Sequence, residues 1–254
     1  MSSGSPAPAA RVRADRSAPL VVAIDSSGPV EVLALVQGQL PLAQLQLRKE
    51  RGSGRSLADS LNRMLALAER TPTDLAAVCV ISGPGSFTGL RVGLALACGL
   101  GDALKIPVFA YPSILGWAYA VGASVLPVAV TLDARRGEVY TALLRLDPSA
   151  APELLQDSTL LSPEAWLARL EEIAPQGAVM VGDGAVLYDG IFEGQLEGKL
   201  SLASPIPAGP DLSKIAFDGV HRLLSGETDA ERPTPIYLRG HDGQNSRKRA
   251  AASI

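Results

Sequence analysis

The sequence predicts an α/β protein, and three observations support this fold class. Short apolar runs have the length and β-branched content of buried strands. Between them lie segments in which apolar residues recur at helical spacing. The chain has 254 residues, 47% of them hydrophobic and only 19% charged, which is the composition of a protein with a sizeable core.

The first 18 residues are rich in Ser, Ala, Pro and Arg and lack the apolar segment of a secretory signal, so a disordered extension is expected. Every later apolar stretch is interrupted before ~18–20 residues, which predicts no membrane span and a soluble, cytoplasmic protein. The formal net charge of −3 provides no broad basic field for holding nucleic acid. Cys79 and Cys98 have no metal or redox spacing and are interpreted as core residues in a reducing compartment.

The first predicted strand covers 20–25, and a second covers 32–36. After a charged, Gly-rich loop at 48–55, a helix is expected over 56–70. Ser56 and Asp59 stand at the N-cap and N3 positions of this helix. Its apolar positions fall on one face.

The centre of the chain is a strand at 78–81, a Gly-rich loop at 82–89 and a helix at 90–104. The free N–H groups at the start of such a helix suit an anion, with Gly83, Gly85, Ser86 and Thr88 as candidate contacts. Alternatively, the glycines only let strand and helix pack closely. The glycine spacing matches neither a P-loop nor the dinucleotide fingerprint.

Small residues recur inside this helix, and glycine in a helix costs roughly 0.5–1 kcal/mol relative to alanine. Gly93, Ala97 and Gly101 follow i, i+4, i+8 spacing. The pattern predicts that another helix packs against this one, either from the same chain or from a partner.

Downstream, a strand at 106–110 and a helix beginning at 113 precede a hairpin formed by 125–132 and 139–144. The hairpin turn displays Asp133, Arg135, Arg136 and Glu138. These residues form either an exposed salt-bridged turn or a contact for an anion or a partner. The residues alone leave both interpretations open, and the family resemblance described below, which includes them, favours the second.

A helix over 162–173 follows, capped by Ser162 with Pro163 at N1. A strand and turn at 179–184 include Gly182 and Gly184, for which a plain turn is favoured over nucleotide binding. Residues 205–210 form a stiff linker, and Asp211 is expected to cap a helix that ends near 224. The tail from 226 is expected to be extended, and disordered from about 240.

The run SGPGSFTGLRVGLALACGLGDALKIPVFAYPSI resembles the signature of the bacterial TsaB (YeaZ) family of tRNA threonylcarbamoyladenosine biosynthesis proteins. Three shorter stretches agree in order and spacing: Ala-Ile-Asp-Ser-Ser from 23, Asp-Ala-Arg-Arg-Gly-Glu-Val-Tyr from 133 and Pro-Ile-Tyr-Leu-Arg from 235. The resemblance covers most of the chain between 20 and 239.

The resemblance implies a degenerate, two-lobed actin-like (ASKHA) fold with mixed sheets flanked by helices. The first lobe would cover 19–111 and include a returning helix at 208–225, and the second would cover 112–207. In active members of this fold, an acid placed like Asp25 helps to position metal-bound phosphate. Here, capping of the following turn by Asp25 is the favoured interpretation.

The resemblance also implies a non-catalytic subunit of the complex that attaches threonylcarbamoyl to adenosine 37 of tRNA. Related TsaD-type enzymes carry a pair of metal-binding histidines on the helix that corresponds to 56–70. This helix has none, and the whole chain contains only His221 and His241. No metal site and no cofactor bound by this chain alone are therefore expected, although the complex uses ATP.

The implied partners are the catalytic subunit TsaD and the ATPase TsaE, with tRNA engaged only through the complex and TsaC supplying the threonylcarbamoyl-adenylate. The isolated chain is a candidate homodimer. The alternative function is an active ATP- or metal-dependent enzyme of the actin-like fold, such as a kinase or glycopeptidase. The predicted partner interface comprises Leu61, Met64, Leu65, Leu90, Gly93, Leu94, Ala97 and Gly101.

Overall fold

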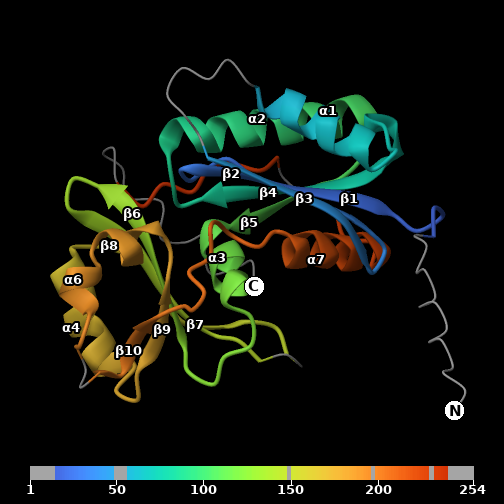
Figure 1. Cartoon of the computed structure of the whole chain (residues 1–254). Coiled ribbons are helices and arrows are strands. Elements are labelled where there is room, and N and C mark those ends of the chain that lie inside the picture. Colours follow the sequence, from blue (N-terminus) through green and yellow to red (C-terminus); the bar gives the residue numbers. More distant parts are fainter. Residues whose placement is uncertain (1–14, 49–55, 148–149, 196–197, 229–231, 240–254) are drawn as a thin grey trace, which may run out of the picture.

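The computed structural model describes residues 15–48, 56–147, 150–195, 198–228 and 232–239. Two five-stranded sheets form the centres of two lobes (Figure 1). The first sheet contains β1 (Leu20–Asp25), β2 (Val30–Gln37), β3 (Leu40–Arg48), β4 (Leu75–Gly83) and β5 (Val108–Pro112). The second contains β6 (Val128–Arg135), β7 (Glu138–Arg145), β8 (Glu153–Leu161), β9 (Ala178–Val181) and β10 (Leu200–Leu202).

The two sheets share one topology. Their strand orders are β3-β2-β1-β4-β5 and β8-β7-β6-β9-β10. In each sheet the three strands that come first in the chain form an antiparallel meander. The two later strands run parallel to the first strand. Parallel neighbours require crossover connections, and helices provide them in both lobes. The lobes are therefore structural repeats of each other.

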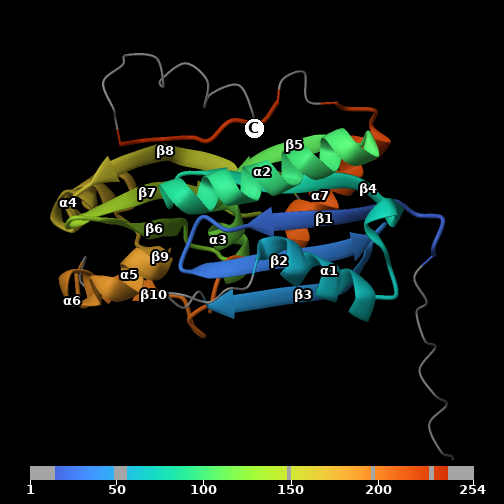
Figure 2. The same cartoon turned by 90° about the horizontal axis from the view of Figure 1, so that it is seen from above.

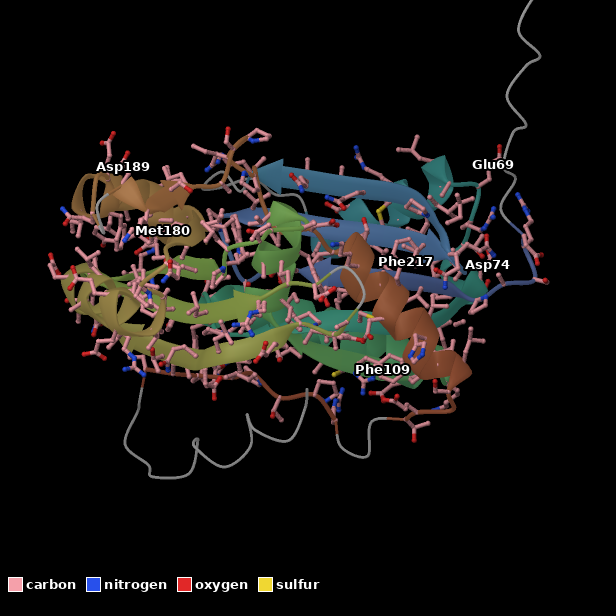
Figure 3. All side chains as sticks on the ribbon, turned by 90° about the horizontal axis from the view of Figure 1, so that it is seen from below. Glu69, Asp74, Phe109, Met180, Asp189 and Phe217 are labelled. Carbon is pink, nitrogen blue, oxygen red and sulfur yellow. The ribbon has the colours of Figure 1, made fainter. Side chains whose placement is uncertain are left out.

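Helices cover both faces of the first sheet. Helices α1 (Leu57–Leu67) and α2 (Phe87–Leu104) lie on one face, and α7 (Ser213–Leu224) lies on the other (Figures 1 and 2). A view from the α7 side labels Phe217 of α7 and Phe109 of β5, which both contribute to the core between this helix and the sheet (Figure 3). In the second lobe, α4 (Pro163–Ile173) and α5 (Asp183–Leu187) pack on one face, followed by α6 (Asp189–Phe192).

The helix that follows each sheet packs on the other lobe. Helix α3 (Ser113–Val121) comes directly after β5, yet Ile114, Trp117 and Ala118 belong to the core of the second lobe. Helix α7 follows the last strand of the second lobe, and it buries Ile215 and Ala216 against the first sheet. The two lobes therefore complete each other's cores.

The capping box predicted for the first helix is confirmed, because Asp59 N donates to Ser56 Oγ at 3.1 Å and the Asp59 side chain accepts from Ser56 N. The expected Asp211 cap is wrong. Leu212 occupies the N-cap position of α7, and the Asp211 carboxylate accepts a hydrogen bond from Ser213 N at 2.8 Å. Strand β3 was not predicted, although its alternating Leu and Gln residues have the period of a half-buried strand.

The expectations for the chain ends fall largely outside the described residues. This applies to 1–14, to 240–254 and to most of the loop predicted at 48–55. Residues 15–18, expected to be disordered, instead form a turn. Ala18 N donates to Asp15 O at 3.1 Å, and Gln37 Nε2 donates to Ala18 O at 2.9 Å.

Helix α2 has 18 residues and is long and apolar enough to cross a membrane, so the expectation that no segment reaches this length is wrong for α2. Length and composition alone are weak support for a membrane span. Leu90 and Leu94 of α2 are buried, and Leu94 and Ala97 belong to the core of the first lobe, whereas Val92 on the other side of the helix is 47% exposed. An apolar core helix of this kind passes the same test.

Candidate functional site

The Gly-rich loop packs directly against the turn after β1. A Cβ atom on Gly85 would lie 2.7 Å from Ser27 Cβ, and a Cβ on Gly89 would overlap the Ser26 carbonyl. Ser26 Oγ donates to Gly89 O at 2.7 Å, and Ser86 N donates to Ser27 O at 2.7 Å. The two loops therefore meet backbone to backbone, which supports the packing interpretation of these glycines.

The start of α2 uses donors that an anion would need. Ser86 is the N-cap, and its hydroxyl accepts from Gly89 N at 3.3 Å. Leu90 N donates to Ser86 O at 2.9 Å, as the first turn of a helix requires. Thr88, the remaining candidate on this loop, is exposed. The contacts of the loop therefore hold the turn after β1, the end of β4 and the start of α2 together.

Asp25 lies at the end of β1 with 2% of its surface exposed. Its carboxylate accepts a hydrogen bond from Ser27 N at 2.7 Å. This contact holds the turn against which the Gly-rich loop packs. The geometry is that of the capping role.

The predicted partner-interface residues are all buried within this chain, which corrects the sequence prediction. They are Leu61, Met64, Leu65, Leu90, Gly93, Leu94, Ala97 and Gly101. A Cβ on Gly93 would lie 2.6 Å from Ser26 Oγ, and one on Gly101 would overlap Val108 Cγ2. The small residues of α2 therefore face the sheet of their own lobe.

The opposite face of α2 is exposed and made of small or apolar residues. We call it the outer stripe, and it comprises Val92, Ala95, Gly99 and Ala103. Val92 is 47% exposed, and a Cβ added to Gly99 would meet nothing within 4 Å. Leu67 on the neighbouring α1 is 86% exposed. Both helices therefore carry exposed apolar residues that the described residues leave uncovered, flanked by polar residues that include Asn62 and Arg63 on α1 and Asp102 on α2.

The predicted hairpin turn between β6 and β7 is confirmed, and most of its charges are paired. Arg135 Nη1 lies 2.9 Å from Asp133 Oδ2, and Glu138 forms an ion pair with Arg239. Arg136 is exposed. These candidates lie in the second lobe, whereas Asp25 and the Gly-rich loop lie in the first.

An extended segment at 232–239, which we call the strap, links the two groups (Figure 2). Ile236 N donates to Ser82 O at 2.7 Å, and a Cβ on Gly83 would lie 2.6 Å from Ile236 O. Farther along, Arg239 Nη2 donates to Ala134 O at 3.0 Å and to Arg135 O at 3.2 Å. At Gly83 the backbone of the strap therefore comes very close to the end of β4, and only glycine leaves room for it.

The role of the strap at the site was not predicted from the sequence, although its Pro-Ile-Tyr-Leu-Arg motif is one of the stretches that resemble the family. Tyr237 stacks on Phe87 with 5.3 Å between ring centroids. Arg91 lies 3.8 Å from the centroid of the Phe87 ring and donates to the Tyr237 hydroxyl at 3.3 Å. The motif match was the available signal for these contacts.

Asp183 lies near the turn end of β6 and accepts a hydrogen bond from Asp133 N at 3.0 Å. Burial raises the pKa of this carboxyl above its ordinary value, and the Asp133 charge adds to the effect. A raised folded-state pKa means that the folded protein binds this proton more tightly than the unfolded chain does. The resulting stabilisation is present below the ordinary carboxyl pKa and is lost as pH rises through the folded-state pKa.

Replacing Asp183 with asparagine should therefore stabilise the fold at pH 7 relative to wild type. The amide oxygen of the new side chain can still accept from Asp133 N, and no charge is buried. The free energy of unfolding should be measured for both proteins between pH 4 and pH 8. The advantage of Asp183→Asn should grow as pH rises, whereas a difference independent of pH would contradict the assignment.

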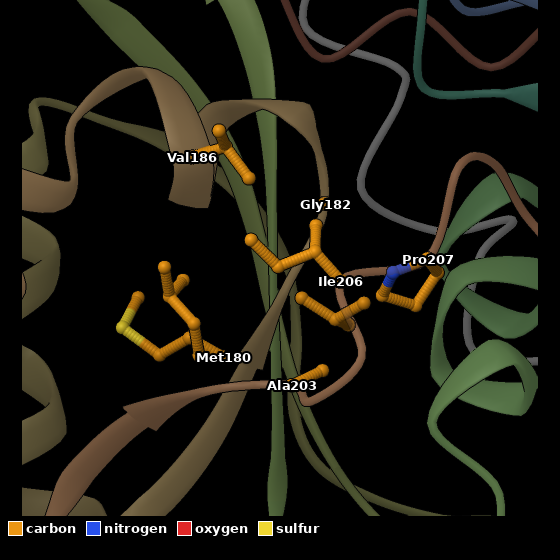
Figure 4. Close-up of a pocket in the computed structure, with 8 residues that line it drawn as sticks. Met180, Gly182, Val186, Ala203, Ile206 and Pro207 are labelled. Atoms are coloured by element: carbon orange, nitrogen blue, oxygen red, sulfur yellow. The ribbon is translucent and has the colours of Figure 1, made fainter.

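A small pocket lies elsewhere, between β9, α5 and the segment that follows β10 (Figure 4). Its lining includes Met180, Val186 and Ile206, and it leaves essentially no room for even a water-sized molecule. Typical ligand pockets occupy ~300–1,000 Å³ and contain converging polar groups. A Cβ on Gly182 would overlap Thr131 O, and one on Gly184 would lie 2.8 Å from Leu132 C. Because Gly182 and Gly184 have no side chain, the turn between β9 and α5 can pack closely against β6.

Within the described ranges, no three His, Cys, Asp or Glu side chains are grouped as metal ligands. Cys79 and Cys98 are buried, and neither forms a disulfide among the described residues. The two histidines of the sequence lie on α7 and beyond the strap.

The family model described as "TsaD: tRNA N6-adenosine threonylcarbamoyltransferase" matches residues 49–203, more than half of the chain. The tRNA threonylcarbamoyladenosine biosynthesis protein TsaB of Escherichia coli (strain K12) is 30% identical over 177 residues, covering 66% of this chain and 73% of that protein. This chain belongs to the TsaB (YeaZ) family. TsaB of Bacillus subtilis (strain 168) is 28% identical over 220 residues, or 86% of this chain and 93% of that protein.

The structure of YeaZ from Pseudomonas aeruginosa supports the same fold, with a TM-score of 0.66 and 23% identity over 87% of this chain and 100% of that chain. The predicted α/β fold with two lobes, each built on a mixed sheet flanked by helices, is confirmed. Through its family, the chain is placed in tRNA threonylcarbamoyladenosine biosynthesis.

Proposed function

We propose that this TsaB-family protein is a non-catalytic subunit that binds and activates TsaD in the synthesis of N6-threonylcarbamoyladenosine at adenosine 37 of tRNA. The observation that carries the proposal is the exposed apolar surface on α1 and α2, centred on the outer stripe. Small residues on a helix let a partner helix approach closely. This surface replaces the buried residues first assigned to the interface.

The glycine-loop geometry also favours a binding role over catalysis. Gly85 and Gly89 make room for the turn at Ser26 and Ser27, and Ser86 N is already bonded within the chain. The helix that would correspond to a metal-binding helix carries no histidine. These features favour a partner protein over the alternative of an active ATP- or metal-dependent enzyme.

The proposal includes the setting of the complex. TsaE joins as the ATPase, TsaC supplies threonylcarbamoyl-adenylate, and the complex consumes ATP while this chain binds no cofactor on its own. The assembly acts in the cytoplasm and engages tRNA as a unit. Without TsaD, the same apolar surface would allow a homodimer.

Reconstitution tests the function directly. TsaC, TsaD, TsaE, tRNA, threonine, bicarbonate and ATP are combined with and without this chain, and modified adenosine is measured. Product should appear only when this chain is present. A parallel reaction keeps the chain and omits TsaD, and it should yield none. Product without TsaD would contradict the non-catalytic role, and product without this chain would contradict activation.

A further inference from the structure

The tip of the β6–β7 hairpin holds arginines in an unfavourable backbone conformation. Arg136 and Gly137 form the two-residue turn, with φ values of 60° and 76°, and Arg135 before them has a φ of 65°. Such turns favour Asn-Gly, because a side chain at positive φ strains the backbone. A Cβ on Gly137 would have nothing within 4 Å, so the tip is open. The fold itself gives no reason for arginine at position 136.

The charge pairing of the turn leaves one guanidinium exposed and unused. Arg135 is paired with Asp133, whose carboxylate also accepts from Arg135 N at 2.8 Å. Glu138 is paired with Arg239, which also holds two carbonyls of the hairpin. Within the part of the chain that the structure describes, no ion pair or hydrogen bond is found for the Arg136 side chain. A turn fixed by these contacts presents Arg136 to solvent.

The strap extends this feature into a basic and aromatic edge. Two residues before Arg239, Tyr237 stacks on Phe87, which is 48% exposed, and Arg91 lies over the same ring. We call Phe87, Arg91, Arg136, Tyr237 and Arg239 the arginine ridge. Arg91 has no acidic partner among the described residues. Cations therefore gather here on a chain whose net charge is −3.

We propose that the arginine ridge binds the sugar-phosphate backbone of tRNA, with Arg136 contacting a phosphate. This inference rests on the proposed function, in which the complex acts on tRNA. Arginine suits bidentate contact with phosphate, and arginines interleaved with exposed aromatic rings are the chemistry of nucleic-acid surfaces. The ridge adds one local contact rather than serving as the main holder of the tRNA.

Binding of a labelled anticodon stem-loop RNA tests the ridge. Affinity is measured at several salt concentrations, for the isolated chain and for its complex with TsaD. Arg136→Ala should weaken binding about 3–10-fold at low salt and reduce the slope of log affinity against log salt by about one. Arg136→Lys should retain part of the affinity. The control is Arg145→Ala, which removes an exposed arginine of the same hairpin at the far end of β7 and should change neither quantity.

A second variant separates binding from folding. Arg136→Asn suits the turn better, so it should raise the melting temperature by about 1–3 °C while weakening RNA binding as Arg136→Ala does. Equal RNA affinity for wild type and Arg136→Ala, in both the isolated chain and the complex, would overturn the proposal.

Loss of TsaD affinity with RNA binding unchanged would identify an acidic protein surface as the ligand instead and would also overturn it. If the wild-type chain fails to bind TsaD, the proposed function fails. The comparison on the isolated chain then still decides the ridge.

Discussion

Replacing Gly93 with leucine should destabilise the folded chain by about 2–6 kcal/mol. A Cβ at this position would lie 2.6 Å from Ser26 Oγ and 3.8 Å from Val80 Cγ2, and leucine adds three further carbons to a closed space. Overpacking of a core costs about 1–3 kcal/mol. Displacing Ser26 would also break its buried hydrogen bond to Gly89 O, which costs about 1–3 kcal/mol more.

Gly99 provides the matched control, because it lies six residues later on the same helix with nothing near its Cβ position. Gly99→Leu should leave the fold intact and gain up to ~1 kcal/mol from helix propensity. Urea unfolding of the isolated chain measures both variants. A Gly93→Leu protein as stable as wild type would mean that this side of α2 does not face the sheet, and it would restore the interface first predicted.

The Ala95→Arg variant should lose TsaD binding by about 100-fold or more while keeping the stability of the fold. Ala95 is exposed in the middle of the outer stripe, so an arginine there is tolerated by the free chain. In a close helix contact it would place a long charged side chain at the interface centre, where an unpaired buried charge costs several kcal/mol. Titration of the variant against TsaD gives the affinity.

Ala168→Arg serves as the control because Ala168 is also an exposed alanine on a helix, but on α4 of the second lobe. It should bind TsaD as wild type does. Equal affinity for the Ala95→Arg variant and wild type would place the TsaD contact elsewhere on the chain. Loss of affinity in both variants would point to a general effect of added charge.

Local patterns predicted the parts of this fold that local chemistry decides. The capping box at Ser56 and Asp59 depends on residues three positions apart, and the β6–β7 hairpin depends on a polar turn between two apolar runs. Strand β3 was missed although its period was visible. The short strand β10 has three residues, which is too few to establish a period.

The direction of the small residues on α2 could not be predicted in the same way. The spacing of Gly93, Ala97 and Gly101 indicates that something packs closely, and it is equally satisfied by a sheet or by a partner helix. Only the position of Ser26 and Val108 beside α2 decides between them. The contact between Arg239 and the hairpin likewise joins residues about a hundred positions apart, beyond the reach of any local pattern.

The exchange of α3 and α7 between the lobes also bears on how the chain can be divided. Helix α7, which follows the whole second sheet in the sequence, covers Val21, Ala23 and Val32 of the first sheet. A fragment ending after the first sheet would expose this apolar face. A fragment beginning at β6 would lack α3, whose Trp117 packs in the core of the second lobe. Although the lobes repeat one topology, neither is an independent folding unit. An ancestral single lobe would have needed a second copy to supply the missing helix.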